Sequence, residues 1–285
     1  MNDFTLPRVP LGRWIETAIG FLQTHLSDLT RAFSEMLGLG LSGIESALLF
    51  VHPLVMIVLI AALTWRATRK WSMGLFALCG FSLILSMGLW DACMSTLTLV
   101  FVSTLMAVVI GVPIGILMAM WQPLRKVLMP LLDVMQTMPS FVYLIPAIPF
   151  FGLGMVSALI ATIVFAAPPA IRFTYLGIRQ VPNELVECAD SFGTTRFQRL
   201  FKLELPMAAP TILAGINQTV MLALSMVVVA AMIGAGGLGG EVWKAIQRLK
   251  LGDGFEAGLG IVIVAICLDR ILQNIGSKSS VKTEK

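Results

Sequence analysis

Seven apolar stretches decide what this chain can fold into. They lie at residues 44–64, 72–90, 94–120, 136–155, 157–176, 208–233 and 255–275. Each has roughly the ~20 residues that a helix needs to cross the hydrocarbon of a bilayer. Only 13% of the 285 residues are charged, whereas an ordinary soluble domain has about 25%. The surplus apolar surface must face lipid, so the sequence predicts an all-α polytopic membrane protein with seven spans.

The segment before the first predicted span has a different pattern. Residues 11–40 have no apolar run long enough to cross a bilayer, but apolar and polar residues alternate there at helical spacing. The apolar positions include Trp14, Phe21, Leu22 and Leu29. This pattern predicts an amphipathic helix at the membrane surface, within an external or interfacial segment at 1–43. The alternative is a soluble helix packed on the rest of the protein.

The basic residues are distributed unevenly among the loops, and this distribution predicts the orientation of the chain in the membrane. Fourteen of the twenty Lys and Arg residues fall on one side of the seven-span topology, five of them within 172–202. Loops rich in Lys and Arg stay in the cytoplasm. We therefore expect the 177–206 loop and a tail at 277–285 to be cytoplasmic, with the N-terminus outside. This sorting also argues against a nucleic-acid-binding surface.

The polar stretch 177–206 is patterned like two short helices. Asn183 is placed to cap the first helix, with Glu184 in its first turn, where the helix dipole favours a negative charge. Gly193 is placed to end this helix in a left-handed conformation. Thr195 and Gln198 have the spacing of a capping box for the second helix. The stretch is therefore expected to form two helices joined at a glycine elbow.

These two helices carry apolar side chains that nothing in the loop would cover. Leu185, Cys188 and Phe192 share one face of the first helix, and Phe197 is on the second. Such a face predicts a docking surface for another protein. Charged residues form its expected rim: Glu187, Asp190, Arg196, Arg199 and Lys202.

The loop also resembles a known motif. Glu187-Cys188-Ala189, then Gly193, then Leu203-x-Leu205-Pro206 is similar to the EAA loop of bacterial ABC importer permeases, which have Ala in place of Cys188 and Ile in place of Leu203. In that family the loop is the coupling helix and lies in a groove of the ATP-hydrolysing subunit. The resemblance implies this role for the matching positions, which are Glu187, Ala189, Gly193, Leu205 and Pro206.

The similarity extends beyond the loop. Residues 136–139, 141–154 and 214–242 resemble the permeases for glycine betaine, proline betaine and choline. The resemblance implies a type I ABC importer transmembrane domain, with a five-helix core at 91–276 and two accessory helices at 44–90. It also implies a homodimer in the bacterial inner membrane, two ATPase subunits that bind ATP and Mg, and an external substrate-binding protein.

The chain carries no signature of its own catalytic, nucleotide or metal site. It contains no GxxxxGK[ST] motif, and the glycine-rich stretch 234–240 lacks the Lys-Ser/Thr that a phosphate loop needs. We expect these glycines to shape a bend or a short re-entrant turn at the outer membrane face. The four cysteines and two histidines are scattered without metal-ligand spacing. No Ser/His/Asp or HExxH arrangement indicates a membrane-embedded enzyme.

The translocation path is only weakly marked. Asn217, Gln218 and Ser225 are polar residues in the sixth span and are candidates for its lining, although interhelical hydrogen bonds explain such residues more often. Pro168-Pro169 marks either the path or a packing kink. A secondary transporter is the alternative function, but no chain of embedded carboxylates indicates an ion relay.

Overall fold

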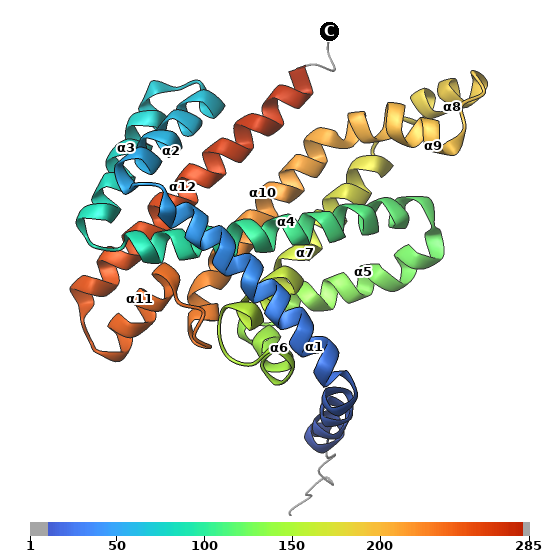
Figure 1. Ribbon diagram of the computed structural model, residues 1–285. Coiled ribbons are helices and arrows are strands. Elements are labelled where there is room, and N and C mark those ends of the chain that lie inside the picture. The colour runs from blue at the N-terminus through green and yellow to red at the C-terminus, as the bar shows by residue number, and fades with distance from the viewer. Residues whose placement is uncertain (1–10, 282–285) are drawn as a thin grey trace, which may run out of the picture.

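The computed structural model describes residues 11–281, which are almost entirely helical (Figure 1). The first ten residues of the predicted 1–43 segment and residues 282–285 of the predicted tail lie outside the described residues. The all-α prediction is confirmed for the described part of the chain. The helices are α1 (Leu11–Phe50), α2 (Pro53–Thr68), α3 (Trp71–Ser86), α4 (Trp90–Met120), α5 (Gln122–Thr137), η1 (Ser140–Tyr143), α6 (Leu144–Phe151), α7 (Met155–Arg179), α8 (Asn183–Ser191), α9 (Arg196–Arg199), the π-turn η2 (Leu200–Glu204), α10 (Leu205–Ala231), α11 (Gly237–Gln247) and α12 (Leu251–Val281).

The first predicted span, 44–64, is wrong as a single helix. The 40-residue helix α1 runs through the amphipathic segment and ends at Phe50, and α2 starts anew at Pro53. Proline has no amide hydrogen and restricts the residue before it to extended backbone, so Val51 and His52 interrupt the helix. By length and apolarity α1 could itself cross a membrane, which the sequence pattern of residues 11–40 did not indicate.

The fourth predicted span, 136–155, is also divided. The helix α5 ends at Thr137, and η1 and α6 continue at a bend of 115°. Met138 is extended at this bend, because a residue before proline is disfavoured in helical backbone. The helices on the two sides of this bend form either a broken span or a re-entrant segment. The helix α6 is short because Gly152 ends it in a positive-φ conformation.

Three long helices, α4, α7 and α10, form the most extensively packed part of the molecule. Small residues allow this close approach: a Cβ on Gly215 of α10 would lie 2.5 Å from the Cβ of Phe173 on α7, and one on Gly115 of α4 would lie 2.5 Å from the Ile171 carbonyl oxygen. Such contacts are typical of helices that pack in a membrane. Pro168 and Pro169 are buried inside a continuous α7, which favours the packing interpretation of this pair.

The remaining helices flank this core. By length and composition, α4, α7 and the run from α9 through α10 could each cross a membrane, as α1 could. The helices α2 and α3 are apolar but shorter, with 16 residues each, and they pack against each other and α12.

The glycine-rich stretch forms a bend, as expected. Gly234, Gly236 and Gly237 all have positive φ, and α11 begins at Gly237. The amide of Leu238 donates a hydrogen bond to the Thr96 hydroxyl oxygen at 2.8 Å, which holds the bend against α4.

Candidate docking loop between α7 and α10

The helices α8 and α9 lie at one end of the molecule. They follow the end of α7 and precede α10, and they project beyond the packed helices, while α11 lies at the opposite end (Figure 1). Any displacement of this loop therefore acts directly on two of the three helices that form the core.

The local backbone follows most of the predicted turn chemistry. The helix α8 begins at Asn183, so Pro182 is the cap residue and the prediction of Asn183 as the cap is wrong. Pro182 has φ of −55° and ψ of 134°, an extended conformation that the restricted φ of proline allows. Gly193 has a φ of +75°, as predicted, and its amide donates to the Asp190 carbonyl oxygen at 2.9 Å.

The predicted capping box is present at the start of α9. The amide of Gln198 donates to the Thr195 hydroxyl oxygen at 3.3 Å, and the Thr195 amide donates to the Gln198 side-chain oxygen at 2.9 Å. Two amides that have no partner within the helix are thereby satisfied. Gly193 and this box together fix the elbow between α8 and α9.

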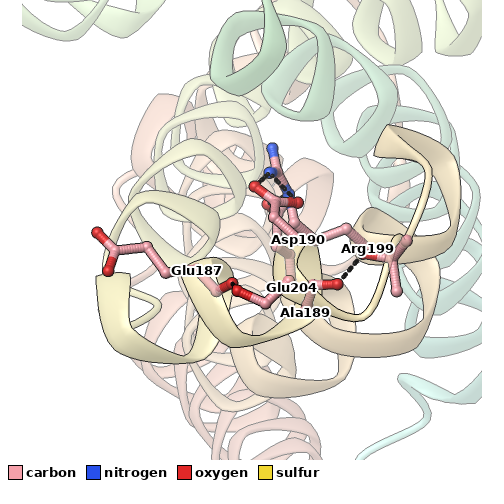
Figure 2. A network of polar contacts seen from close by, with 7 residues as sticks. Glu187, Ala189, Asp190, Arg199 and Glu204 are labelled. Atoms are coloured by element: carbon pink, nitrogen blue, oxygen red, sulfur yellow. Dashed lines mark hydrogen bonds and ion pairs between the residues drawn. The ribbon is translucent and has the colours of Figure 1, made fainter.

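A single arginine ties the three parts of the loop together (Figure 2). The Nη1 atom of Arg199 in α9 donates to both carboxylate oxygens of Asp190 in α8, at 2.9 and 2.7 Å. Its Nε donates to Glu204 Oε1 in the π-turn at 2.9 Å. The Arg199 and Glu204 side chains are only 24% and 13% exposed. Charge-assisted bonds between a guanidinium group and carboxylates are among the stronger hydrogen bonds in proteins.

The loop is anchored to the core by a small apolar cluster. Leu200 is buried together with Ile178 of α7 and Ala208 of α10. The π-turn at Leu200–Glu204 leads directly into α10. Arg199 thus joins the parts of the loop to one another, and Leu200 packs the loop against α7 and α10. The loop therefore forms one rigid unit.

The predicted docking face is exposed on this unit. Phe192 is 85% exposed and Phe197 is 68% exposed, and Leu185 and Cys188 are exposed as well. Glu187 points away from the Arg199 network in Figure 2 and makes none of its bonds. An exposed group of large apolar side chains on a fixed support is typical of a surface that binds another protein.

The remaining positions matched to the EAA motif have different surroundings. Ala189 is half-buried, and its carbonyl oxygen accepts hydrogen bonds from the amide and the hydroxyl of Thr194. Leu205 is half-buried against the cluster around Leu200. Pro206 is exposed in the first turn of α10, directly after the π-turn, within a helical run that continues from Arg196 to Ala231. These residues shape the loop, whereas Glu187 and the apolar face are free to contact a partner.

The three candidate path residues do not share one environment. Asn217 is half-buried and its Nδ2 donates to Asp269 Oδ1 of α12 at 3.0 Å. Gln218 and Ser225 are exposed on α10, and the Ser225 hydroxyl donates to the Leu222 carbonyl oxygen. Asn217 therefore makes the interhelical hydrogen bond that the sequence left as the alternative.

The described residues contain no group of three His, Cys, Asp or Glu side chains that could hold a metal ion. Cys93 and Cys267 are buried, and Cys79 and Cys188 are exposed free thiols.

Comparisons with known proteins identify relatives over nearly the whole chain. Residues 111–277 match the family described as "Binding-protein-dependent transport system inner membrane component". The chain is 48% identical to the glycine betaine transport system permease protein OpuAB of Bacillus subtilis, over 96% of each chain. It is 43% identical to the glycine betaine/proline betaine transport system permease protein ProW of Escherichia coli, over 98% of this chain and 78% of ProW.

A solved structure supports the fold. A chain of the MetNI methionine ABC transporter in an inward-facing conformation superposes with a TM-score of 0.61 at 22% identity, covering 65% of this chain and 93% of that one. At this identity the likeness concerns the fold alone, which is that of a type I ABC importer transmembrane subunit.

Proposed function

This chain belongs to the family of binding-protein-dependent transport system inner membrane components, and we propose that it carries glycine betaine, proline betaine or choline across the membrane. The substrates named for its relatives support this substrate class. Relatives at 43–48% identity transport glycine betaine or proline betaine, and a more distant relative in Bacillus subtilis, at 29% identity, is a choline transport permease. The role is that of a non-catalytic transport subunit.

The family implies partners that supply energy and substrate. We expect an ATP-binding cassette subunit in two copies, with ATP and Mg bound there rather than on this chain. We also expect an external substrate-binding protein and a homodimer of this chain. The basic 172–202 segment supports placing α8 and α9 in the cytoplasm.

The exposed face of α8 and α9 is the observation that carries the proposal of ATPase coupling. Leu185, Phe192 and Phe197 are exposed, although large apolar side chains favour burial. The same segment carries the EAA-like residues Glu187 and Gly193. A separate ATPase that covers this face would remove the apolar surface from water, and Glu187 at its edge would favour one orientation of docking.

Rigid anchoring explains how docking could drive transport. The loop continues into α7 at one end and into α10 at the other, and these two helices pack closely where Gly215 meets Phe173. A movement of the ATPase would therefore shift α7 and α10 as a pair. Since packed interfaces exchange between discrete arrangements, such a shift can switch access from one side of the membrane to the other.

The path itself is assigned to the exposed side of α10. Gln218 and Ser225 are polar and exposed there, and a second copy of the chain would enclose them. Their neutral polar side chains would let a quaternary ammonium compound pass without holding it tightly. Selectivity then resides in the external binding protein.

Uptake in proteoliposomes tests the proposal. The chain would be reconstituted with its ATPase and binding protein, and ATP-dependent uptake of radiolabelled glycine betaine, proline betaine and choline would be measured. Glu187→Arg places a reversed charge at the docking edge and should reduce uptake by more than tenfold. Glu35→Arg makes the same change at an exposed site on α1 and should leave uptake unchanged.

Each outcome separates one part of the proposal. Uptake driven by an ion gradient without ATP would overturn the importer mechanism. Normal uptake by Glu187→Arg would refute the docking assignment alone. If none of the three compounds is transported by an assembly that hydrolyses ATP, the substrate class is wrong.

A further inference from the structure

The turn between α2 and α3 combines an aromatic pair with three basic residues. Trp65 lies in the last turns of α2 and Trp71 begins α3, with ring centroids 4.6 Å apart. Arg66, Arg69 and Lys70 surround them in the sequence. A shallow, open depression of about 340 Å³ is lined by the two tryptophans together with Arg66 and Arg69. The turn is therefore a shallow, positively charged site with aromatic walls.

The backbone fixes this arrangement. Arg69 adopts a left-handed conformation with φ of +56°, and its amide donates to the Trp65 carbonyl oxygen at 2.7 Å. A Cβ on Gly74 would lie 2.9 Å from the Cβ of Trp65, so the glycine lets α3 approach α2 closely. The shape of this depression is thus set by a tight two-residue connection rather than by a loose loop.

The positive charge at this turn is not neutralised by the protein. No Asp or Glu occurs between Glu45 and Asp91 in the sequence. Over residues 11–281, no carboxylate forms an ion pair with the three basic side chains of the turn. By contrast, Lys244 and Lys250 at the other end of the molecule are paired with Glu241 and Asp253. The three basic side chains of the turn are therefore free to bind an anion from outside the chain.

The flanks of the turn indicate where that anion comes from. Each helix of the hairpin has 16 residues and is about 24 Å long, which is shorter than the ~30 Å hydrocarbon core. The outward face of the hairpin is aliphatic and suits contact with acyl chains, whereas the long basic side chains of the turn favour the depth of the lipid headgroups. Tryptophan is enriched at that depth because one part of its ring is apolar and the other can donate a hydrogen bond. The exposed aliphatic residues are Leu54, Val55, Val58, Leu59, Leu63, Leu75, Leu78 and Leu83.

We propose that the α2–α3 turn binds the headgroup of an anionic phospholipid. The guanidinium groups of Arg66 and Arg69 contact the phosphate, for which their planar donor geometry is suited. The indole rings of Trp65 and Trp71 flank the glycerol region, and the aliphatic face of the hairpin contacts the acyl chains. This site is separate from the docking loop and does not depend on which substrate is carried.

Native mass spectrometry of the purified full chain tests the proposal. The chain in detergent would be titrated with phosphatidylglycerol or with phosphatidylcholine of the same acyl chains. The wild type should retain phosphatidylglycerol preferentially. Arg66→Gln/Arg69→Asn should bind it about thirtyfold more weakly, since each basic residue near an anionic surface contributes roughly a factor of five. Asparagine is chosen at position 69 because it tolerates positive φ.

Three further variants make the result specific. Arg66→Lys/Arg69→Lys keeps the charge and should keep the lipid preference. Trp71→Leu keeps all three basic residues and should weaken binding of both lipids severalfold, because an aromatic wall is lost. Arg248→Gln/Lys250→Gln removes the same charge from the turn before α12, where carboxylates are nearby, and should bind phosphatidylglycerol as the wild type does.

Equal retention of the two lipids by the wild type would overturn the proposal. It would also be overturned if Arg66→Gln/Arg69→Asn bound phosphatidylglycerol normally, or if the control at positions 248 and 250 lost as much binding. Thermal unfolding of each variant checks that the fold is retained. We expect unchanged unfolding temperatures because all substituted side chains are exposed.

Discussion

Replacing Arg199 by alanine should loosen the docking loop without unfolding the membrane core. The arginine bonds to Asp190, which is half exposed, and to Glu204, which is 13% exposed. The exposed pair contributes about 0.5 kcal/mol. Breaking a fully buried pair costs about 3–5 kcal/mol because a charge stays behind without a partner, and the partial exposure of this pair reduces the cost to about 1.5 kcal/mol. The sum is about 2 kcal/mol.

Hydrogen exchange measures this loss directly. A decrease of about 2 kcal/mol in the free energy of local opening raises the open population roughly thirtyfold. Amides of α8 and α9 should therefore exchange roughly thirtyfold faster in Arg199→Ala, while those of α4 and α7 stay unchanged. Arg199→Lys keeps the charge but loses the fork geometry, so its exchange rates should lie between those of the alanine variant and the wild type.

Transport by the same variant tests the mechanical role of the loop. A loosened loop would follow the ATPase without moving α7 and α10, so more ATP should be hydrolysed per molecule of substrate carried. Arg248→Ala is the control, since Arg248 is an exposed arginine outside the docking loop and has no ion-pair partner among residues 11–281. Unchanged exchange in Arg199→Ala would refute the structural reasoning. Faster exchange with normal coupling would show that rigidity is not required.

Four further substitutions separate packing from transport. Gly115→Val should lower the unfolding temperature and decrease the free energy of unfolding by about 3 kcal/mol, because the new Cβ would lie 2.5 Å from the Ile171 carbonyl oxygen. Gly43→Val is the control in the same thermal scan, since a Cβ at Gly43 meets nothing within 4 Å. Gly193→Val should cost about 1–2 kcal/mol of loop stability because φ is +75° there, and unaltered exchange of the Thr194 amide would contradict this. Asn217→Val should lower the free energy of unfolding by about 0.6 kcal/mol through the lost bond to Asp269 and leave the KM for uptake unchanged. Gln218→Leu should alter uptake and leave the free energy of unfolding unchanged. The reverse pattern would place Asn217 on the translocation path and give Gln218 a packing role.

Much of the fold follows from local rules that the sequence displays. Apolar runs of about twenty residues mark α4, α7 and α10, because the bilayer sets that length independently of the partners. The capping box at Thr195 and the left-handed Gly193 are similarly local, since each depends on residues at most a few positions away.

The division of the first and fourth predicted spans shows the limit of that approach. Hydropathy averages over a window and does not register where a backbone turns. The signals were present in the sequence as Pro53 and Pro139, each of which forces the preceding residue out of helical backbone. Pro168 and Pro169, however, lie within a continuous helix. Whether a helix continues past a proline or ends there therefore depends also on the tertiary packing around it.

The Arg199 network could not be found from spacing, although Asp190 and Arg199 had been placed together on the charged rim. Residues that face each other on a helix are three or four positions apart, whereas Arg199 is nine residues from Asp190 and five from Glu204. The elbow at Gly193 folds α9 back toward α8, and the π-turn then brings Glu204 to the same guanidinium group. Two departures from regular helix therefore create one rigid unit, and the residue that links them carries no sequence signal of its own. The exposed residues of a docking loop can be predicted from the sequence pattern. The residue that makes the loop rigid can be identified only when the turns are placed in space.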